Sequence, residues 1–152
     1  MDSRSILGTL ERLVESSKIA ILATSDPDGQ PHMRWMTPTI LKGRQGAIYA
    51  VTSPAFEKTT QLAANPRVEW MVQSRSMDEI LCARGAMSVL DNPAVKALVL
   101  ESLGAHLSTF WKMNSDEGSL VVLETALDYV RYVKPASGER HEVNLGDDYG
   151  QA

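Results

Sequence analysis

A phosphate-binding site can be assembled from a short stretch near the middle of this chain. Thr52 and Ser53 provide hydroxyl donors, and Lys58 provides a full positive charge. Ser53 suits the N-cap of a helix and Pro54 suits its first position, so a helix is predicted to begin there. Free N–H groups and the positive end of the dipole at a helix start attract anions. The alternative interpretation is an ordinary strand-to-helix turn with a solvated lysine.

A second group of candidate residues lies in a strand predicted from Pro31 to Leu41. An arginine in mid-strand, Arg34, needs an anion, a carboxylate or solvent as its partner, and an arginine on a solvated rim is the alternative. Pro38 cannot donate to a strand ladder, so an edge or a bulge is predicted there. Free backbone groups at such an edge can pair with the polar rim of a flat heterocycle. Alternation puts the residues on two faces, His32, Arg34 and Met36 on one, and Met33, Trp35 and Thr37 on the other.

The elements predicted around these residues are mainly strands joined by short turns. A strand at 48–51 leads into the helix from Pro54, and Asn65-Pro66 ends that helix. Gly85 predicts a bulge or bend in a long strand at 80–90. Short turns favour antiparallel pairing, and six or seven such strands usually close into a barrel. Asp26-Pro27-Asp28-Gly29 predicts a tight turn that joins a strand at 19–24 to the Pro31 strand as a hairpin.

Two further helices are predicted, one in the first 17 residues and one after Asn92. Their inner stripes are Ile6, Leu7, Leu10, Leu13 and Val14 in the first, and Val95, Leu98, Val99 and Ser102 in the second. The remaining predicted elements are strands at 68–73, 120–124 and 127–134, and a polar, mobile tail over 135–152.

The composition is that of one globular domain spanning residues 1–152. The chain is 43% hydrophobic with a formal net charge of -4, which argues against a general nucleic-acid binder. Its single cysteine, Cys82, cannot form an internal disulfide. No apolar run reaches the length of a membrane span and no signal peptide is recognised, so a cytoplasmic protein is expected. The histidines lack the spacing of a metal site, and His32 is either structural or part of a ligand cleft.

Three sequence runs, in this order and spacing, carry a resemblance to a known family. They are D-P-D-G-Q-P-H-M-R-W-M-T-P, then A-I-Y-A-V-T-S-P-A-F-E-K-T-T-Q-L-A-A-N-P-R-V, then the strand that contains Gly85. Over residues 18 to 90 the chain resembles the pyridoxamine 5'-phosphate oxidase-like, FMN-binding split-barrel family, in its short, general-stress-type members. The resemblance implies a mainly β fold, with a six-stranded antiparallel split barrel and peripheral helices. It also implies a homodimer with FMN in two equivalent clefts at the interface.

The resemblance also implies which residues hold the cofactor. Arg34 matches the family's motif arginine, and Lys58 matches its phosphate-binding lysine. The implied cofactor-binding set is Arg34, Trp35, Met36, Thr37, Val51, Thr52, Ser53 and Lys58, with no catalytic residue named and no metal.

Three positions depart from the oxidase itself. Glu57 stands where the oxidase has an arginine, Thr39 where it has a lysine and Ile80 where it has a glutamine. Pyridoxine-phosphate oxidation is therefore not expected. The expected function is FMN-dependent electron or hydride transfer between small soluble molecules. The alternatives are a non-catalytic protein that binds flavin, deazaflavin or haem, and a dimeric scaffold in which Glu57 has abolished cofactor binding.

Overall fold

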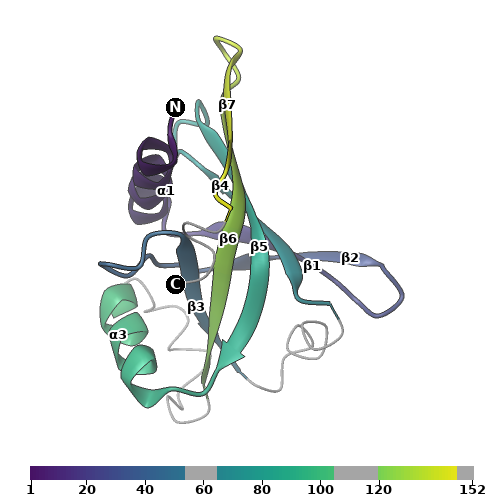
Figure 1. Cartoon of the computed structure of the whole chain (residues 1–152), viewed down its shortest axis with the longest axis vertical. Helices are drawn as coiled ribbons and strands as arrows, with labels where there is room; N and C mark the ends of the chain where they lie inside the picture. Colours follow the sequence, from purple (N-terminus) through teal and green to yellow (C-terminus); the bar gives the residue numbers. More distant parts are fainter. Residues whose placement is uncertain (54–64, 105–119, 147–152) are drawn as a thin grey trace.

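The structure is a computed structural model that describes residues 1–53, 65–104 and 120–146 (Figure 1). The helix predicted from Pro54, with Glu57 and Lys58, lies outside the described residues. His106 and Trp111 lie outside them too. In the described part, no helix is long and apolar enough to cross a membrane.

One antiparallel sheet of seven strands forms the body of the structure (Figure 1). The strands run in the order β2-β1-β4-β5-β6-β3, and β7 also pairs with β6. The mainly β, antiparallel fold predicted from the sequence is confirmed, although the sheet is not closed and has one strand more than the six predicted. The strands are β1 (Ala20–Ser25), β2 (Pro31–Met36), β3 (Ala47–Thr52), β4 (Arg67–Gln73), β5 (Ile80–Leu90), β6 (Val121–Lys134) and β7 (Glu139–Asn144).

The C-terminal part differs from the sequence prediction. Two short strands were expected at 120–124 and 127–134, but β6 is continuous and pairs with β5 from Val122 to Val133, with one register shift. Its first half pairs on the other edge with β3 and its second half with β7. A mobile tail was expected from residue 135, but Glu139–Asn144 forms β7. The sequence did not predict β7 because its residues are mostly polar. Most of its side chains face solvent, and Val143 is the β7 residue that packs against the core.

Gly85 marks a bulge, as predicted. The pairing of β5 with β6 shifts register between Arg84 and Gly85. A Cβ atom on Gly85 would lie 2.0 Å from the carbonyl oxygen of Ala126, so only glycine permits this approach of the two backbones.

Two described helices pack on opposite faces of β3: α1 belongs to the apolar cluster that contains Ile48 and Ala50, and α3 to the cluster that contains Tyr49 and Val51. Helix α1 (Ser3–Ser17) begins at an Asp2 cap and buries an apolar stripe, which the sequence predicted: Ile6, Leu7, Leu10, Leu13 and Val14. Helix α3 (Pro93–Leu103) begins at an Asn92 cap and ends at Gly104. Leu98 was expected on its buried face but is 50% exposed, and Leu103 is buried instead. The C-terminal ends of both helices lie near the segment that follows β2.

An ionic contact fixes α1 on the sheet. The Arg12 guanidinium donates two hydrogen bonds to the Glu79 carboxylate, at 2.6 and 3.2 Å. Tyr132 donates its hydroxyl to the same carboxylate. Burial, and then this hydrogen bond, raise the pKa of Tyr132 to about 12. The Arg12 contact comes first among the causes that lower the pKa of Glu79, so the pair is charged at neutral pH.

Candidate functional site

The segment that follows β2 meets β3 at one point, and the candidate site is sought around this segment and the ends of β2 and β3. An isolated antiparallel bridge joins Thr39 to Tyr49, with backbone hydrogen bonds of 2.8 and 2.9 Å. Pro38 has no N–H to donate, which explains why β2 ends at Met36 rather than at Leu41, where it was expected to end.

The two faces of β2 are those predicted from alternation. Trp35 and Met33 are 76% and 73% exposed, while Arg34 and Met36 are half-buried. Met36 packs against the main core. Trp35 therefore points away from the core side that Arg34 and Met36 share, and the two predicted cofactor contacts Trp35 and Met36 lie on opposite faces of the strand.

Arg34 crosses the neighbouring strand β1. Its Nη1 atom lies 2.7 Å from the Thr24 hydroxyl and 3.4 Å from the Leu22 carbonyl oxygen, and it donates to both. The guanidinium is thus held on the core side of the β1–β2 hairpin rather than on a solvated rim. These hydrogen bonds to β1 fix the position of the guanidinium group, which has N–H donors on its other nitrogen atoms as well.

Thr52 ends β3 with an unsatisfied hydroxyl. The residue is 1% exposed, and among the described side chains its Oγ1 is the buried polar atom that has no hydrogen-bond partner. A buried hydroxyl without a partner costs about 1–3 kcal/mol. Val51, also buried, precedes it, and half-buried Ser53 follows directly. The end of β3 therefore presents a hydroxyl donor for which the described chain supplies no acceptor.

His32 belongs to the turn rather than to the site. Its Nε2 atom lies 3.0 Å from Asp26 Oδ2, and the other Asp26 oxygen accepts from the backbone N–H groups of Asp28 and Gln30. The His32 contact is the largest cause of the lowered pKa of Asp26, followed by the Gln30 N–H. This contact supports the structural interpretation of the histidine. In the described residues no group of three or more metal-ligating side chains occurs.

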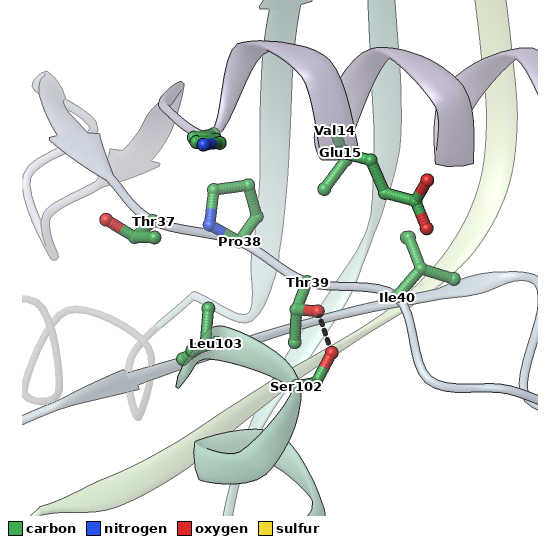
Figure 2. Close-up of a pocket in the computed structure, with 9 residues that line it drawn as sticks. Val14, Glu15, Thr37, Pro38, Thr39, Ile40, Ser102 and Leu103 are labelled. Atoms are coloured by element: carbon green, nitrogen blue, oxygen red, sulfur yellow. Dashed lines mark hydrogen bonds between the residues drawn. The ribbon is translucent and has the colours of Figure 1, made fainter. Parts of the chain in front are cut away.

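A cleft of about 310 Å³ opens beside the segment that follows β2 (Figure 2). The last turns of α1 and α3 form its other walls. A hydrogen bond between the Thr39 and Ser102 hydroxyls joins the segment to α3 across the cleft. The complete lining is Val14, Glu15, Lys18, Thr37, Pro38, Thr39, Ile40, Ser102 and Leu103.

Among the cleft residues, sequence reasoning named only Thr37 as a cofactor contact, although it also singled out Pro38 and Thr39 in the same segment. Glu15, Lys18 and Ser102 come from helix ends far away in the chain, and no local motif connects them. The signal that could have pointed to Ser102 was its place on the predicted inner stripe of α3, facing the sheet.

The predicted cofactor residues in the described part fall into two groups. Arg34, Met36 and Thr37 lie at or directly after the end of β2, and Val51, Thr52 and Ser53 lie at the end of β3. Among the described residues, the Thr39–Tyr49 bridge joins the two segments. Trp35 lies on the opposite face of β2, and Lys58 lies outside the described residues. These two segments carry one unpaired buried hydroxyl, one anchored guanidinium and an interrupted strand edge, which are groups that can bind an elongated polar ligand.

Comparison with known proteins finds a family model and solved structures that match this chain. The family model described as pyridoxamine 5'-phosphate oxidase matches residues 6–134. A protein related to general stress protein 26 from Clostridium acetobutylicum superposes with a TM-score of 0.74 at 17% identity, covering 97% of this chain and 99% of that one. No curated protein matches the sequence.

Two further solved structures share the fold and differ in the ligand that their descriptions give. A heme binding protein from Mycobacterium smegmatis has a TM-score of 0.73 at 19% identity, over 95% of this chain and 60% of that one. A pyridoxamine 5'-phosphate oxidase-related, FMN binding protein from Nostoc punctiforme has a TM-score of 0.63 at 12% identity, over 91% and 95%. At these identities the neighbours establish the split-barrel fold, and both ligand classes occur on it.

Proposed function

The chain belongs to the pyridoxamine 5'-phosphate oxidase family, and we propose that within this family it is an FMN-binding oxidoreductase. The observation that carries the proposal is the buried, unpartnered Thr52 hydroxyl at the end of β3. FMN has phosphate and ribityl oxygens along its length, and either kind can accept the hydrogen bond that Thr52 offers. A bound ligand that satisfies this donor explains why a hydroxyl is retained where valine would fill the same space.

The neighbouring residues have complementary roles in this proposal. Arg34, anchored on Thr24, would bring a positive charge to the core side of the site. The backbone of Thr37, next to the interrupted pairing at Pro38, would meet the polar rim of the flavin ring. Lys58 and Ser53 would hold the phosphate. When bound, FMN supplies hydride or electron transfer, while the protein binds, orients and shields it.

Replacing Thr52 by valine separates the cofactor interpretation from a packing role. We expect Thr52→Val to weaken FMN binding by about tenfold, because one hydrogen bond to the ligand is lost. The same change should raise the unfolding free energy of the cofactor-free protein by about 1 kcal/mol, because an unsatisfied buried hydroxyl is removed. FMN fluorescence quenching and urea denaturation measure the two effects.

Thr125 provides the matched control for this experiment. It is also fully buried in the sheet, but its Oγ1 accepts a hydrogen bond from Trp70 Nε1 at 3.0 Å. Thr125→Val should therefore destabilise the protein by about 1–3 kcal/mol and leave FMN affinity unchanged in the folded fraction. If Thr52→Val leaves FMN affinity unchanged as well, Thr52 does not contact the cofactor.

A haem-binding function is the second candidate, because a haem-binding protein shares the fold. The described histidines give it little support. His32 is engaged by Asp26, and His141 lies 3.3 Å from Glu139 on β7, in the outer hairpin. FMN can accept the hydrogen bond that Thr52 offers, and it needs no protein ligand of the kind that haem iron takes. FMN is therefore the cofactor proposed here.

Turnover with a nicotinamide donor distinguishes an enzyme from a flavin carrier. We propose that the loaded protein transfers electrons from a small soluble donor to a small soluble acceptor. Bleaching of the flavin band by NADH or NADPH under anaerobic conditions, followed by recovery with an acceptor, supports the enzyme. A flavin that neither donor reduces supports the carrier.

We also propose that the protein is a homodimer that associates through an apolar area on the outer face of the sheet. Strand register sets Trp35, Ile21 and Met71 side by side across β2, β1 and β4. Ile19 and Met77, at the rim of the same shallow groove, are 49% and 68% exposed. Exposed apolar areas of this kind mark interaction sites. A second copy is the proposed occupant because the area continues directly into the strand that carries Arg34.

The association of two copies depends on Trp35 in this proposal. We expect Trp35→Glu to convert the dimer into a monomer at micromolar concentration, because an aromatic contact is replaced by a buried charge. Leu98→Glu, which changes an exposed apolar residue on α3, should leave the dimer intact. Sedimentation velocity measures both variants, and a wild-type protein that is monomeric with FMN bound contradicts the proposal.

A further inference from the structure

The cleft between the ends of α1 and α3 carries charges that nothing in the described chain neutralises. Glu15 and Lys18 both line it, and neither side chain forms an ion pair or a hydrogen bond with a described residue. They are three positions apart at the end of α1, so they lie on the same side of the helix. Figure 2 shows Glu15 extending from α1 toward Ile40. The cleft therefore presents one anionic and one cationic group.

The backbone conformation of Lys18 makes the presence of a side chain there notable. Lys18 caps α1 in the left-handed region with φ 65°, a conformation that favours glycine. Its backbone N–H satisfies the Val14 carbonyl, which glycine would do equally well. The conformation itself therefore gives no reason for a lysine, whereas a cationic side chain at the cleft does.

Two helix C-termini meet at this cleft. Ser102 and Leu103 belong to the last turn of α3, and Val14 to the last turn of α1. The negative ends of both helix dipoles therefore lie near the cleft and favour a positive group of a ligand. Glu15 acts in the same direction, so an ammonium group fits this part of the cleft.

The Lys18 ammonium and the hydrogen-bonded hydroxyls of Thr39 and Ser102 favour a negative group of a ligand. Thr39 and Ser102 hydrogen-bond to each other, and only one of the two hydroxyls is the donor. The accepting hydroxyl keeps a proton of its own, for which no described group is an acceptor. Together with the Lys18 ammonium, this proton can serve a carboxylate.

We infer that this cleft binds a small zwitterionic molecule of amino-acid size. Its volume of about 310 Å³ limits the ligand to a small molecule. The side chains of Val14, Pro38, Ile40 and Leu103 add apolar surface between the charged ends. Thr37 and Pro38 belong both to this cleft and to the flavin-lining segment, so the zwitterion is assigned as the substrate. That assignment rests on the proposed function, whereas binding of the zwitterion does not.

L-leucine and two analogues with one charge each test this inference. N-acetyl-L-leucine keeps only the carboxylate, and L-leucinamide keeps only the ammonium. Each is titrated into the isotope-labelled, full-length protein, and binding is read from the amide signals of Thr37, Thr39 and Ile40. We expect L-leucine to saturate these signals with a dissociation constant of about 1 mM or below, and each analogue to bind about tenfold more weakly.

Two charge variants assign the ends of the ligand. Lys18→Met should weaken L-leucine and N-acetyl-L-leucine by about tenfold and leave L-leucinamide unchanged. Glu15→Gln should weaken L-leucine and L-leucinamide and leave N-acetyl-L-leucine unchanged. Lys96→Met, which removes a charge near the start of α3, should change none of the three.

Several outcomes overturn the inference. L-leucine that does not saturate by about 50 mM, or that binds equally to wild type and both charge variants, excludes a zwitterion site in the cleft. An FMN titration on the same samples separates this result from the proposed function. FMN binding without L-leucine binding contradicts the cleft assignment alone, and L-leucine binding without FMN binding contradicts the proposed function alone.

Discussion

Gly85→Ala is expected to destabilise the protein by about 3 kcal/mol, near the upper end of the usual cost of overpacking. The added Cβ would lie 2.0 Å from the carbonyl oxygen and 2.8 Å from the carbonyl carbon of Ala126. Both atoms belong to the backbone of β6, so no flexible side chain can yield. The central strand pair β5–β6 would have to separate at its bulge. Urea denaturation of the purified variant measures the loss.

Gly8→Ala is the matched control for that experiment. Gly8 lies in the middle of α1, and a Cβ added there meets nothing within 4 Å. Alanine should therefore stabilise the helix by up to about 1 kcal/mol, since it loses less backbone entropy than glycine. If Gly85→Ala is as stable as Gly8→Ala, the close approach of β5 and β6 at the bulge is wrong.

The largest expected effect on the cofactor comes from Lys58. This residue lies outside the described part of the structure, so the prediction rests on the sequence, where Lys58 follows the predicted helix start at Pro54. A charge-assisted contact with the FMN phosphate contributes about 1.5–3 kcal/mol. We therefore expect Lys58→Ala to weaken FMN binding by roughly tenfold to a hundredfold at fixed salt, measured by fluorescence quenching.

Glu57→Arg is the companion to Lys58→Ala, because it restores the arginine of the oxidase. On the helix predicted from Pro54, neighbouring residues would point about a quarter turn apart or more, so Glu57 and Lys58 are not expected to face the phosphate equally. Salt and water screen the repulsion between the FMN phosphate and a Glu57 carboxylate that faces solvent, so this repulsion would be small. If Glu57 faces solvent, we expect Glu57→Arg to tighten FMN by less than about tenfold; if it faces the phosphate, we expect about tenfold or more. Unchanged FMN affinity in Lys58→Ala would contradict the phosphate-binding interpretation of this stretch and leave the Arg34 strand as its support.

Local signals explain the part of the fold that the sequence predicted correctly. The hairpin of β1 and β2 follows from the Asp26-Pro27-Asp28-Gly29 turn, in which Gly29 has φ 86°. The β5 bulge follows from Gly85. Proline at position 38 indicated the interrupted edge. In each case one residue limits its own backbone conformation, so a few neighbouring residues are enough to predict it.

Contacts between distant segments explain what the sequence did not predict. β7 has weak alternation and is stabilised by pairing with the second half of β6. The cleft forms because two helix ends meet the segment after β2, and no pattern within either helix encodes that meeting. The orphaned state of the Thr52 hydroxyl also depends on all of its neighbours. The type of this residue was predictable, but its lack of a partner required the structure.

The absorption spectrum of the purified protein, with quantification of the released ligand, is the most direct test of the FMN-binding proposal. We predict a flavin band near about 450 nm and FMN at about one molecule per chain after reconstitution. A Soret band from bound haem would contradict the proposal. So would a protein that stays colourless and does not quench added FMN.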